Sequence, residues 1–323
     1  MKFRTMIAIL IGFYVALPLF LGNNYYVMSL LVAALTIAGV ALAWALLGNL
    51  GGMVSFGHAA FFGVGAYVSA LLTLKLHFPI FPAMLLGGVG SMLAAIAVLP
   101  ALRLSGPYFA LAILAYAHIF RILATEFKGI TNGSAGLSSI PQLPHYLGFD
   151  FSSKLGGYFV IITLVLLFTY CYHLIRKSCY GLALRAMHDS EDATRVVGVN
   201  STRLKAMMLF VSAFMTGIIG AFNAHFINFL EPDYAFSSVW TVLPIVAAIF
   251  GGYRTLAGPL AGAVAVYLMD QLIFKNILPH GHHIMFGVLL GAMILLSPDG
   301  LVPLVSRKVI NKLRLKRECH AAS

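Results

Sequence analysis

Apolar runs, each about as long as a helix that crosses a membrane, follow one another along the whole sequence. Hydropathy places ten of them at 6–22, 26–47, 59–76, 82–101, 107–124, 156–175, 205–228, 238–253, 257–274 and 283–304. A bilayer-spanning helix needs about 20 mainly apolar residues. With 60% hydrophobic and 10% charged residues, the chain has too little polar surface to cover a soluble core. We therefore predict an all-α, polytopic membrane protein with about ten transmembrane helices.

The basic residues indicate how these helices are oriented. With the N-terminus inside, 16 of the 21 Lys and Arg residues fall on the cytoplasmic side, as the positive-inside rule requires. This orientation makes 125–155 an external loop, 176–204 a cytoplasmic segment and 305–323 a basic cytoplasmic tail. The first apolar run is interpreted as a retained span, because no small-residue cleavage site follows it and its removal would invert every loop.

The net charge of +11 follows the same topology. Because the basic residues lie in short connections and at the termini, we expect contact with anionic membrane lipid and no binding of nucleic acid. His145, His280, His282 and His283 lie in external loops without carboxylates at ligand spacing, so no metal site is predicted.

The cytoplasmic segment has a helical pattern from Gly181 to Val197. We expect one amphipathic helix there, with apolar and charged residues on opposite faces. Leu182, Ala186, Ala193 and Val197 would form the apolar face, and Arg185, Asp189, Asp192 and Arg195 the charged one. Small apolar side chains favour packing on a protein over insertion into lipid.

Glycines interrupt two apolar runs between residues 48 and 58. Irregular backbone at membrane depth needs protein or a water-filled cavity to satisfy it, and transporters use such broken helices to line a pathway. An ordinary cytoplasmic hairpin is an equally good interpretation of this stretch.

The sequence lacks the residues and motifs that proton coupling, ATP binding and catalysis usually require. Proton-coupled carriers depend on buried carboxylates or histidines, but none of the ten carboxylates falls at the middle of a predicted span, Asp270 being the nearest. No phosphate-binding Gly-x-x-x-x-Gly-Lys-Ser/Thr motif and no catalytic motif occurs. We expect no enzyme and no cofactor, so energy for active transport would come from another protein.

Four blocks, in order, resemble the branched-chain amino-acid ABC permeases, and in particular the M-type subunits of high-affinity leucine/isoleucine/valine systems. They are 48–67 (GNLGGMVSFGHAAFFGVGAY), 102–121 (LRLSGPYFALAILAYAHIFR), 131–141 (TNGSAGLSSIP) and 180–199 (YGLALRAMHDSEDATRVVGV). Gly251-Gly252 and Gly258-Pro259 match a further pattern of that family. The resemblance implies a single permease domain over 1–323 in a bacterial inner membrane. It also implies a second homologous permease subunit, two cytosolic ATPase subunits that use the ATP, and a periplasmic solute-binding protein.

The resemblance also assigns roles to residues. It makes 181–199 the helix that couples to an ATPase, with signature positions Gly181, Arg185, Ala186, Asp189, Ala193 and Gly198. Candidates for lining the substrate pathway, or for packing beside it, are Ser55, Phe56, His58, Tyr108 and Phe109. Candidates for docking the binding protein are Thr131, Gly133 and Gly136.

The chain departs from the family pattern at Asn132, at His188 and at 253–256. These departures do not change the expected fold, but they leave the identity of the substrate undetermined. Urea, short amides, sugars and nucleosides stay alternatives to amino acids, as does a self-sufficient secondary carrier.

Overall fold

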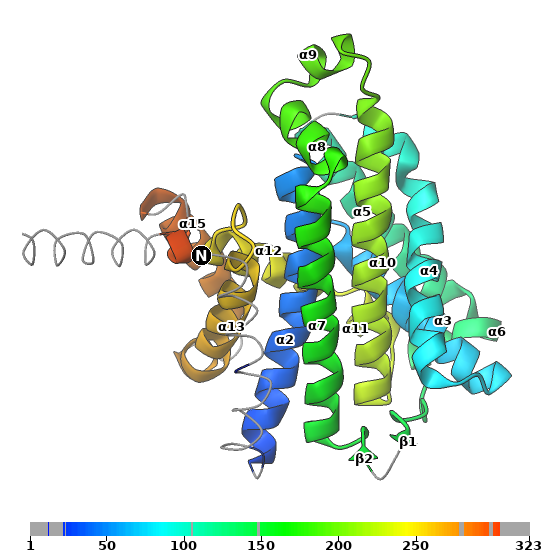
Figure 1. Cartoon of the computed structure of the whole chain (residues 1–323). Coiled ribbons are helices and arrows are strands. Elements are labelled where there is room, and N and C mark those ends of the chain that lie inside the picture. Colours follow the sequence, from blue (N-terminus) through cyan, green and yellow to red (C-terminus); the bar gives the residue numbers. More distant parts are fainter. Residues whose placement is uncertain are drawn as a thin grey trace, which may run out of the picture.

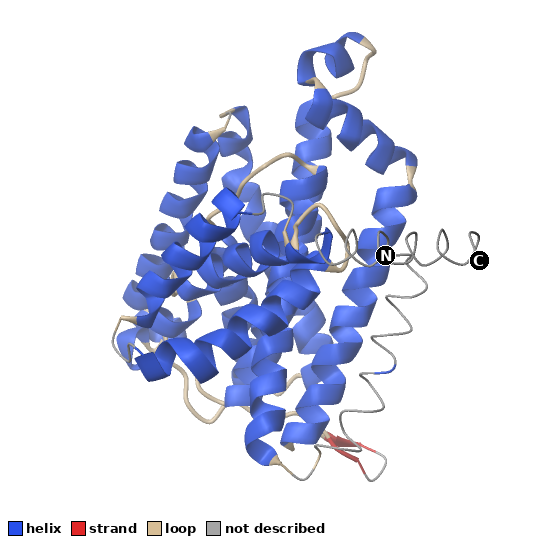
Figure 2. Cartoon of the chain, turned by 90° about the vertical axis from the view of Figure 1, so that its left-hand side faces the viewer, coloured by secondary structure: helices blue, strands red, loops and turns tan. Residues whose placement is uncertain are grey.

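The computed structural model describes residues 24–104, 106–146, 149–277, 281–296 and 300–303, together with Gly12 and Gly22. Most of them are helical, and the strands within these ranges form one hairpin with two residues in each strand (Figures 1 and 2). The predicted first span at 6–22 and the basic tail at 305–323 lie outside the described residues, apart from Gly12 and Gly22.

The apolar runs form the long helices. These are α2 (Tyr25–Ala45) with the π-helix η1 (Leu46–Leu50), α3 (His58–Leu76), α4 (Ile80–Val98) with η2 (Leu99–Arg103), α5 (Pro107–Glu126), α7 (Lys154–Lys177), α10 (Ser201–Ile227), α11 (Pro232–Ala235) with α12 (Val239–Gly251), α13 (Gly258–Met269) with η4 (Asp270–Phe274) and α14 (Lys275–Ile277), and α15 (His282–Leu296). Eight of these stretches are long and apolar enough to cross a membrane, and α15 contributes the shorter apolar helix Ile284–Met293. The chain is therefore a multi-pass membrane protein, as predicted, with eight such helices among the residues described.

Shorter elements occupy the two long connections. They are α6 (Lys128–Thr131), η3 (Gly133–Ala135), β1 (His145–Tyr146) and β2 (Phe149–Asp150) in the first, and α8 (Cys179–Asp189) and α9 (Glu191–Val196) in the second. The strands pair antiparallel, with His145 opposite Asp150. Polar side chains cap the helices that follow: Ser153 accepts a hydrogen bond from the Gly156 N–H at the start of α7, and Asn200 from the Arg203 N–H at the start of α10.

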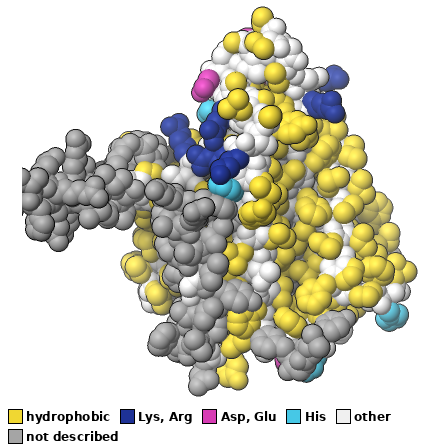
Figure 3. All heavy atoms as spheres, in the orientation of Figure 1, with side chains coloured by type: hydrophobic (Ala, Val, Ile, Leu, Met, Phe, Trp, Pro, Cys, Tyr) yellow, Lys and Arg dark blue, Asp and Glu magenta, His cyan; other side chains and the backbone are white. Residues whose placement is uncertain are grey.

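The two connections lie at opposite ends of the bundle. We call the end with α8 and α9 the coupling end and the end with β1 and β2 the hairpin end (Figure 1). On the face seen in Figure 3, the basic side chains gather near the coupling end and the surface beside the long helices is mainly hydrophobic. Hydrophobic flanks are expected where the solvent around a helix bundle is lipid.

Helices α3, α4 and α10 approach one another through glycines. A Cβ atom on Gly65 of α3 would collide with the backbone of Gly217 in α10, and one on Gly87 of α4 would lie 2.6 Å from the Gly65 carbonyl. Small residues at such crossings allow the close backbone contact on which helix association in lipid depends. These glycines therefore fix how the helices around the site pack.

Candidate functional site

The chain between η1 and α3 turns back into the bundle. After the π-helix, Gly52 adopts φ +66°, and the Trp44 Nε1–H donates a hydrogen bond of 2.9 Å to the carbonyl of Ser55. Trp44 lies in α2, six residues before the end of η1, so this bond brings the chain back beside the helix that it has just left. In the irregular stretch 51–57, which we call the broken segment, Gly51, Met53, Ser55 and Gly57 are buried, whereas Gly52 and Val54 are exposed.

Side chains satisfy the backbone of the broken segment. The Thr241 hydroxyl of α12 donates to the Phe56 carbonyl at 3.2 Å and accepts from the Ala59 N–H at 3.2 Å. The Ser55 hydroxyl accepts from the Gly57 N–H at 3.2 Å. This protein-satisfied arrangement is the one expected of a broken helix at membrane depth, and it differs from a solvated hairpin.

His58 and Ser55 are fully buried in this structure, and their place on a substrate pathway stays a prediction. The Ser212 hydroxyl donates to the Ala43 carbonyl at 2.8 Å, so its one proton is committed. The 2.9 Å contact between Ser212 Oγ and His58 Nε2 therefore requires the imidazole to donate. His58 in this way ties together α2, α3 and α10.

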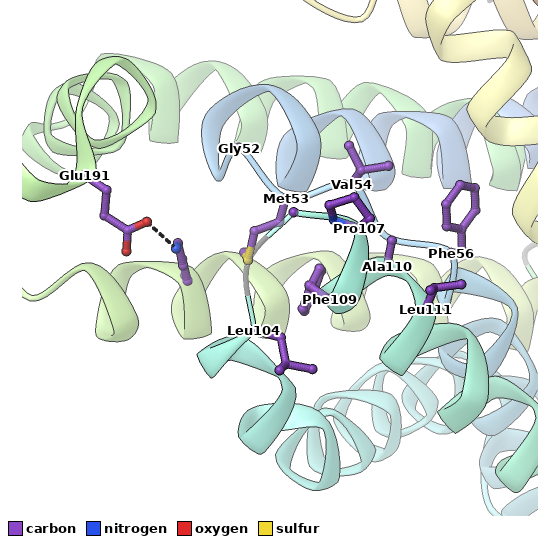
Figure 4. A pocket seen from close by; sticks show the side chains of 12 residues that line it. Gly52, Met53, Val54, Phe56, Leu104, Pro107, Phe109, Ala110, Leu111 and Glu191 are labelled. Carbon is purple, nitrogen blue, oxygen red and sulfur yellow. Dashed lines mark hydrogen bonds and ion pairs between the residues drawn. The ribbon is translucent and has the colours of Figure 1, made fainter.

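A cavity of about 570 Å³ opens beside the broken segment (Figure 4). Its lining joins three parts of the chain: the broken segment, the start of α5 and the base of the coupling end. The lining residues are Gly52, Met53, Val54, Phe56, Leu104, Gly106, Pro107, Phe109, Ala110, Leu111, Glu191 and Lys205. Of the predicted pathway residues, Phe56 and Phe109 reach this cavity, whereas Tyr108 is 70% exposed on the outside of α5.

An ion-pair cluster closes the cavity toward the coupling end. Glu191 accepts hydrogen bonds from Lys205 Nζ and from Arg195 Nη2, each at 2.8 Å (Figure 4 draws the Lys205 bond). The hydrogen bond from Lys205 holds the pKa of Glu191 below its usual value, and the nearby charges act in the same direction. The cluster attaches α9 to the first turns of α10.

The coupling segment consists of two helices, where one was expected. Ser190 ends α8 in extended geometry, and its hydroxyl accepts from the Ala193 N–H to begin α9. Gly181, Leu184 and Met187 are buried, whereas all four residues of the predicted apolar face are exposed, so that face is open to a partner protein; they are Leu182, Ala186, Ala193 and Val197.

Five of the six predicted coupling residues are exposed, which leaves them accessible to a partner. They are Arg185, Ala186, Asp189, Ala193 and Gly198. The sixth, Gly181, is buried at the corner between α7 and α8, where a Cβ would collide with the Ile175 carbonyl. The segment also touches the broken segment, since a Cβ on Gly52 would lie 2.9 Å from Nδ1 of His188.

The three residues predicted to dock a binding protein are buried within their own loop. The Thr131 hydroxyl lies 2.6 and 2.8 Å from the Ala124 and Phe127 carbonyls, which share its one proton, and it accepts from the Gly133 N–H. Gly136, with φ +72°, lies against the Leu230 carbonyl, beside the bridge that pairs Leu137 with Leu230. These residues shape the loop, and their role in docking stays a prediction.

A buried histidine anchors the same loop. His225 of α10 is 1% exposed, and its Nδ1–H donates to the Pro141 carbonyl at 2.8 Å. Its Nε2 then accepts from the Ser69 hydroxyl at 2.9 Å, which connects α10 to α3. The hairpin-end loop is therefore attached to the helices that surround the broken segment.

Sequence reasoning missed one charged residue. Asp270 was expected near the outer end of a span, but it is 4% exposed, at the start of η4. The expectation that buried carboxylates are lacking is therefore corrected. Within the described parts of the chain, no group of three or more His, Cys, Asp or Glu side chains is placed to hold a metal ion.

A multi-pass helical bundle with a broken segment inside it and exposed helices at one end belongs to the class of membrane permeases. Residues 26–298 match the family described as "Branched-chain amino acid transport system / permease component". Because the match covers most of the sequence, the chain belongs to this family.

Relatives in several organisms are similar to the chain. It is 28% identical over 281 residues to the high-affinity branched-chain amino acid transport system permease protein LivM of Salmonella typhimurium, and 27% identical to that of Escherichia coli. Each alignment covers 79% of this chain and 65% of the relative, so the chain spans slightly less than two thirds of their length.

The chain is also similar, at lower identity or over a shorter stretch, to two other kinds of permease. The permease protein LivH of Escherichia coli is 21% identical over 83% of the chain and 91% of its own length. The ribose import permease protein RbsC of Bacillus subtilis is 24% identical over 46% of the chain and 48% of its own length. No solved structure gives a significant match.

Proposed function

We propose that the chain is the membrane-spanning permease subunit of an ABC importer that carries branched-chain or related amino acids across a bacterial inner membrane. Its partners would be a second homologous permease subunit, two cytosolic ATPase subunits and a periplasmic solute-binding protein. The ATP would be used by the partners, and the chain itself would be neither an enzyme nor the holder of a cofactor. Family membership and the LivM relatives support this proposal.

The observation on which the proposal rests is the connection between the coupling segment and the broken segment. Exposed apolar side chains on α8 and α9 offer a docking surface, because such groups in a polar connection favour contact with protein; they are Tyr180, Leu182, Val196 and Val197. Beneath that surface, His188 lies against Gly52, and Glu191 binds Lys205 at the edge of the cavity. A push on α8 and α9 therefore acts on the cavity wall.

The mechanism would be alternating access driven from outside the chain. A loaded binding protein would dock at the hairpin end, on the loop 125–155, and ATP binding would bring the two motors together. Each motor would displace a coupling segment and bias the packed helices toward one of two arrangements. Phe56 and Phe109 would then change the access of the cavity to either side.

The proposed topology places the coupling end and both termini in the cytoplasm. The basic side chains near that end support it, through the positive-inside rule (Figure 3). The loop 125–155 would then be periplasmic, and the basic residues would face anionic lipid headgroups.

A permease of the same architecture for a different small solute is the second candidate, since a ribose import permease is among the relatives. Uptake of labelled leucine and ribose, measured with the complete transporter in proteoliposomes, separates the two. Uptake that needs ATP and prefers leucine supports the proposal. Concentration of solute by the chain alone would establish a secondary carrier instead.

Docking on α8 is tested most cleanly at Ala186, which is exposed. Ala186→Leu should reduce substrate-stimulated ATP hydrolysis by about tenfold, because a bulkier side chain displaces a close interface. Ala97→Leu, at an exposed position of α4, is the matched control and should leave stimulation unchanged. Normal stimulation in Ala186→Leu would remove the docking assignment. Gly198 is a poorer site for this test, because its φ of +87° strains any replacement.

A further inference from the structure

Asp270 is a carboxylate inside the bundle with one oxygen unpaired. Its side chain is 6% exposed, and among the described residues Oδ1 has no hydrogen-bond partner. Removing an ionised carboxylate from water costs several kcal/mol unless a partner repays it. An ionisable residue in a spanning helix that lacks such repayment is the usual mark of a ligand or ion site.

The nearest cation does not satisfy this carboxylate. Lys275 Nζ lies 4.0 Å from Oδ2, beyond hydrogen-bond distance, and is 41% exposed. It donates instead to the Gln271 side-chain oxygen at 3.1 Å. Asp270 also begins the π-helix η4, and π-helical turns within α-helices occur frequently at functional sites.

The carboxylate lies in the wall of a second cavity, of about 470 Å³, toward the hairpin end. Eight elements contribute to its walls: α2, α10, α11, α12, α13, η4, α14 and α15. The side chains of greatest use to a ligand are Thr36, Asn223, Tyr234, Trp240, Asp270 and Phe286. A cavity of this size, mostly apolar with a few polar groups, is typical of small-molecule sites.

Hydrogen bonds hold the aromatic wall in place without the help of a ligand. The Tyr234 hydroxyl donates to the Asn223 side-chain oxygen at 2.9 Å, and the Trp240 Nε1–H donates to the Tyr234 carbonyl at 3.0 Å. The site is therefore preformed, which lowers the entropic cost of binding. Aromatic rings beside a carboxylate favour an organic cation.

We propose that this cavity binds a small molecule through its protonated amine, with Asp270 as the counter-ion. The best fit to the proposed function, on which this choice rests, is an α-amino acid with an apolar side chain. Its ammonium group would pair with Asp270 Oδ1, and its side chain would lie against the apolar wall. The permease would then hold its substrate at a site of its own after release from the binding protein.

An inorganic cation fits the site less well. Cations such as Ca²⁺ take six to eight oxygen ligands. This wall offers one carboxylate, and the Tyr234 hydroxyl already takes one of the two lone pairs of the Asn223 oxygen. A single carboxylate with aromatic neighbours matches an ammonium group better.

The test uses the full chain in lipid nanodiscs, without ATPases or binding protein. Trp240 lines the cavity and Trp44, the other of the chain's two tryptophans, lies at the broken segment, so tryptophan emission reports binding. The probes are L-leucine, 3-methylbutylamine, which lacks the carboxylate, and 4-methylpentanoate, which lacks the amine. We expect saturable emission changes with the first two and none with the third.

Variants then assign the binding to the carboxylate. Asp270→Asn keeps the shape and removes the charge, and it should weaken binding of both amines by at least about tenfold, since charge-assisted contacts are worth more than neutral ones. Asp270→Glu should retain binding. Asp150→Asn, an exposed aspartate at the same end of the bundle, is the matched control and should bind like the parent chain.

Three results would overturn the inference: unchanged binding in Asp270→Asn, equal binding of 4-methylpentanoate, or a response to NaCl that leucine does not compete with. Because no ATPase is present, the outcome is independent of coupling. If the chain binds neither amine but the assembled transporter still takes up substrate with ATP, this inference fails and the proposed function stands. If the chain binds the amines but substrate does not stimulate ATP hydrolysis in the assembled complex, the proposed function fails and this inference stands.

Discussion

At the residue scale, Asn132 accounts for one departure of this chain from its family pattern. The resemblance of 131–141 to the family pattern implies glycine at this position, and Asn132 adopts φ +63°, a left-handed conformation that glycine takes without strain. Among other residues, asparagine tolerates it best. The Asn132 side-chain amide also donates to the Gly136 carbonyl at 2.9 Å, so the replacement keeps the loop geometry and adds a hydrogen bond.

This account predicts an order of stabilities at position 132. Asn132→Gly should be nearly neutral, whereas Asn132→Val should lower the free energy of unfolding by about 1–2 kcal/mol, because β-branched side chains are strained at positive φ. Thermal unfolding in detergent measures both. Ser134→Val, exposed in the same loop but without positive φ, is the control and should match the parent chain. Equal stability of Asn132→Val and Ser134→Val would contradict the conformational argument.

Single residues were also the hardest to predict. When a helix is apolar on all sides, its sequence does not reveal which face points inward. The sequence therefore placed Asp270 near the end of a span but did not show that its side chain is buried. Its burial follows from the position of η4 in the fold, beside a cavity that residues of α2, α10 and α12 also line, which the sequence alone does not supply. Phe56, in the broken segment, and Phe109, after Pro107, were candidates for a pathway, and both line a cavity, while Tyr108 is exposed; their role in a pathway stays a prediction.

At the element scale, most helices could be predicted, because span length is imposed by the membrane. The predicted runs 59–76 and 107–124 correspond to α3 and α5 within two residues at each end. The coupling segment was less predictable. Its helical period continues through Ser190, but the serine hydroxyl competes for the backbone and starts a new helix, which rotates the second face.

The close contact between Gly65 of α3 and Gly217 of α10 should contribute to the stability of the helix bundle. Gly65→Ala should destabilise the bundle by about 1–3 kcal/mol, because the new methyl group would overlap the Gly217 backbone and force the helices apart. Gly291→Ala is the control, since nothing lies within 4 Å of that position in α15. It should be neutral or slightly stabilising, as alanine favours helices over glycine. Melting temperature and monodispersity after purification measure the difference.

The attachment of α9 to α10 should depend on pH through Glu191. Hydrogen bonding to Lys205 lowers the pKa of Glu191 in the native state, so the ionised carboxylate stabilises α9 fully above its ordinary pKa of 4.5. This stabilisation is lost as the pH falls from the ordinary pKa of Glu191 through its lower pKa in the native state. Pairs as exposed as this one contribute about 0.5–1 kcal/mol, so opening of α9 should increase roughly two- to fivefold at acid pH.

Hydrogen exchange of the α9 amides, corrected for the intrinsic pH dependence, measures this opening. Glu191→Gln should show the open level already at neutral pH and no further acid response. Asp192→Asn, an exposed neighbour in the same helix, should respond as the parent chain does. An acid response that persists in Glu191→Gln would assign it to another group.

At the scale of the whole molecule, the two ends of the bundle are connected through the same few helices. The loop at the hairpin end is attached to α10 by His225, which also accepts from Ser69 of α3, and the coupling end is attached to α10 by Lys205. Between them, His58 holds α3 to α10 through Ser212. A signal from either end therefore reaches the broken segment through α3 and α10, which is what a gate operated from both sides requires.

This arrangement functions as proposed only if the two ends face opposite sides of the membrane, and cysteine labelling tests that directly. Cys179 is exposed at the start of α8, and Ser134 is exposed in the loop at the hairpin end. In a background with Cys171→Ser and Cys319→Ser, a membrane-impermeant maleimide added to spheroplasts should label Ser134→Cys and leave Cys179 unmodified until the membrane is permeabilised. Labelling of Cys179 in intact spheroplasts would put α8 and α9 on the periplasmic face, where no ATPase reaches them, and would exclude the coupling mechanism.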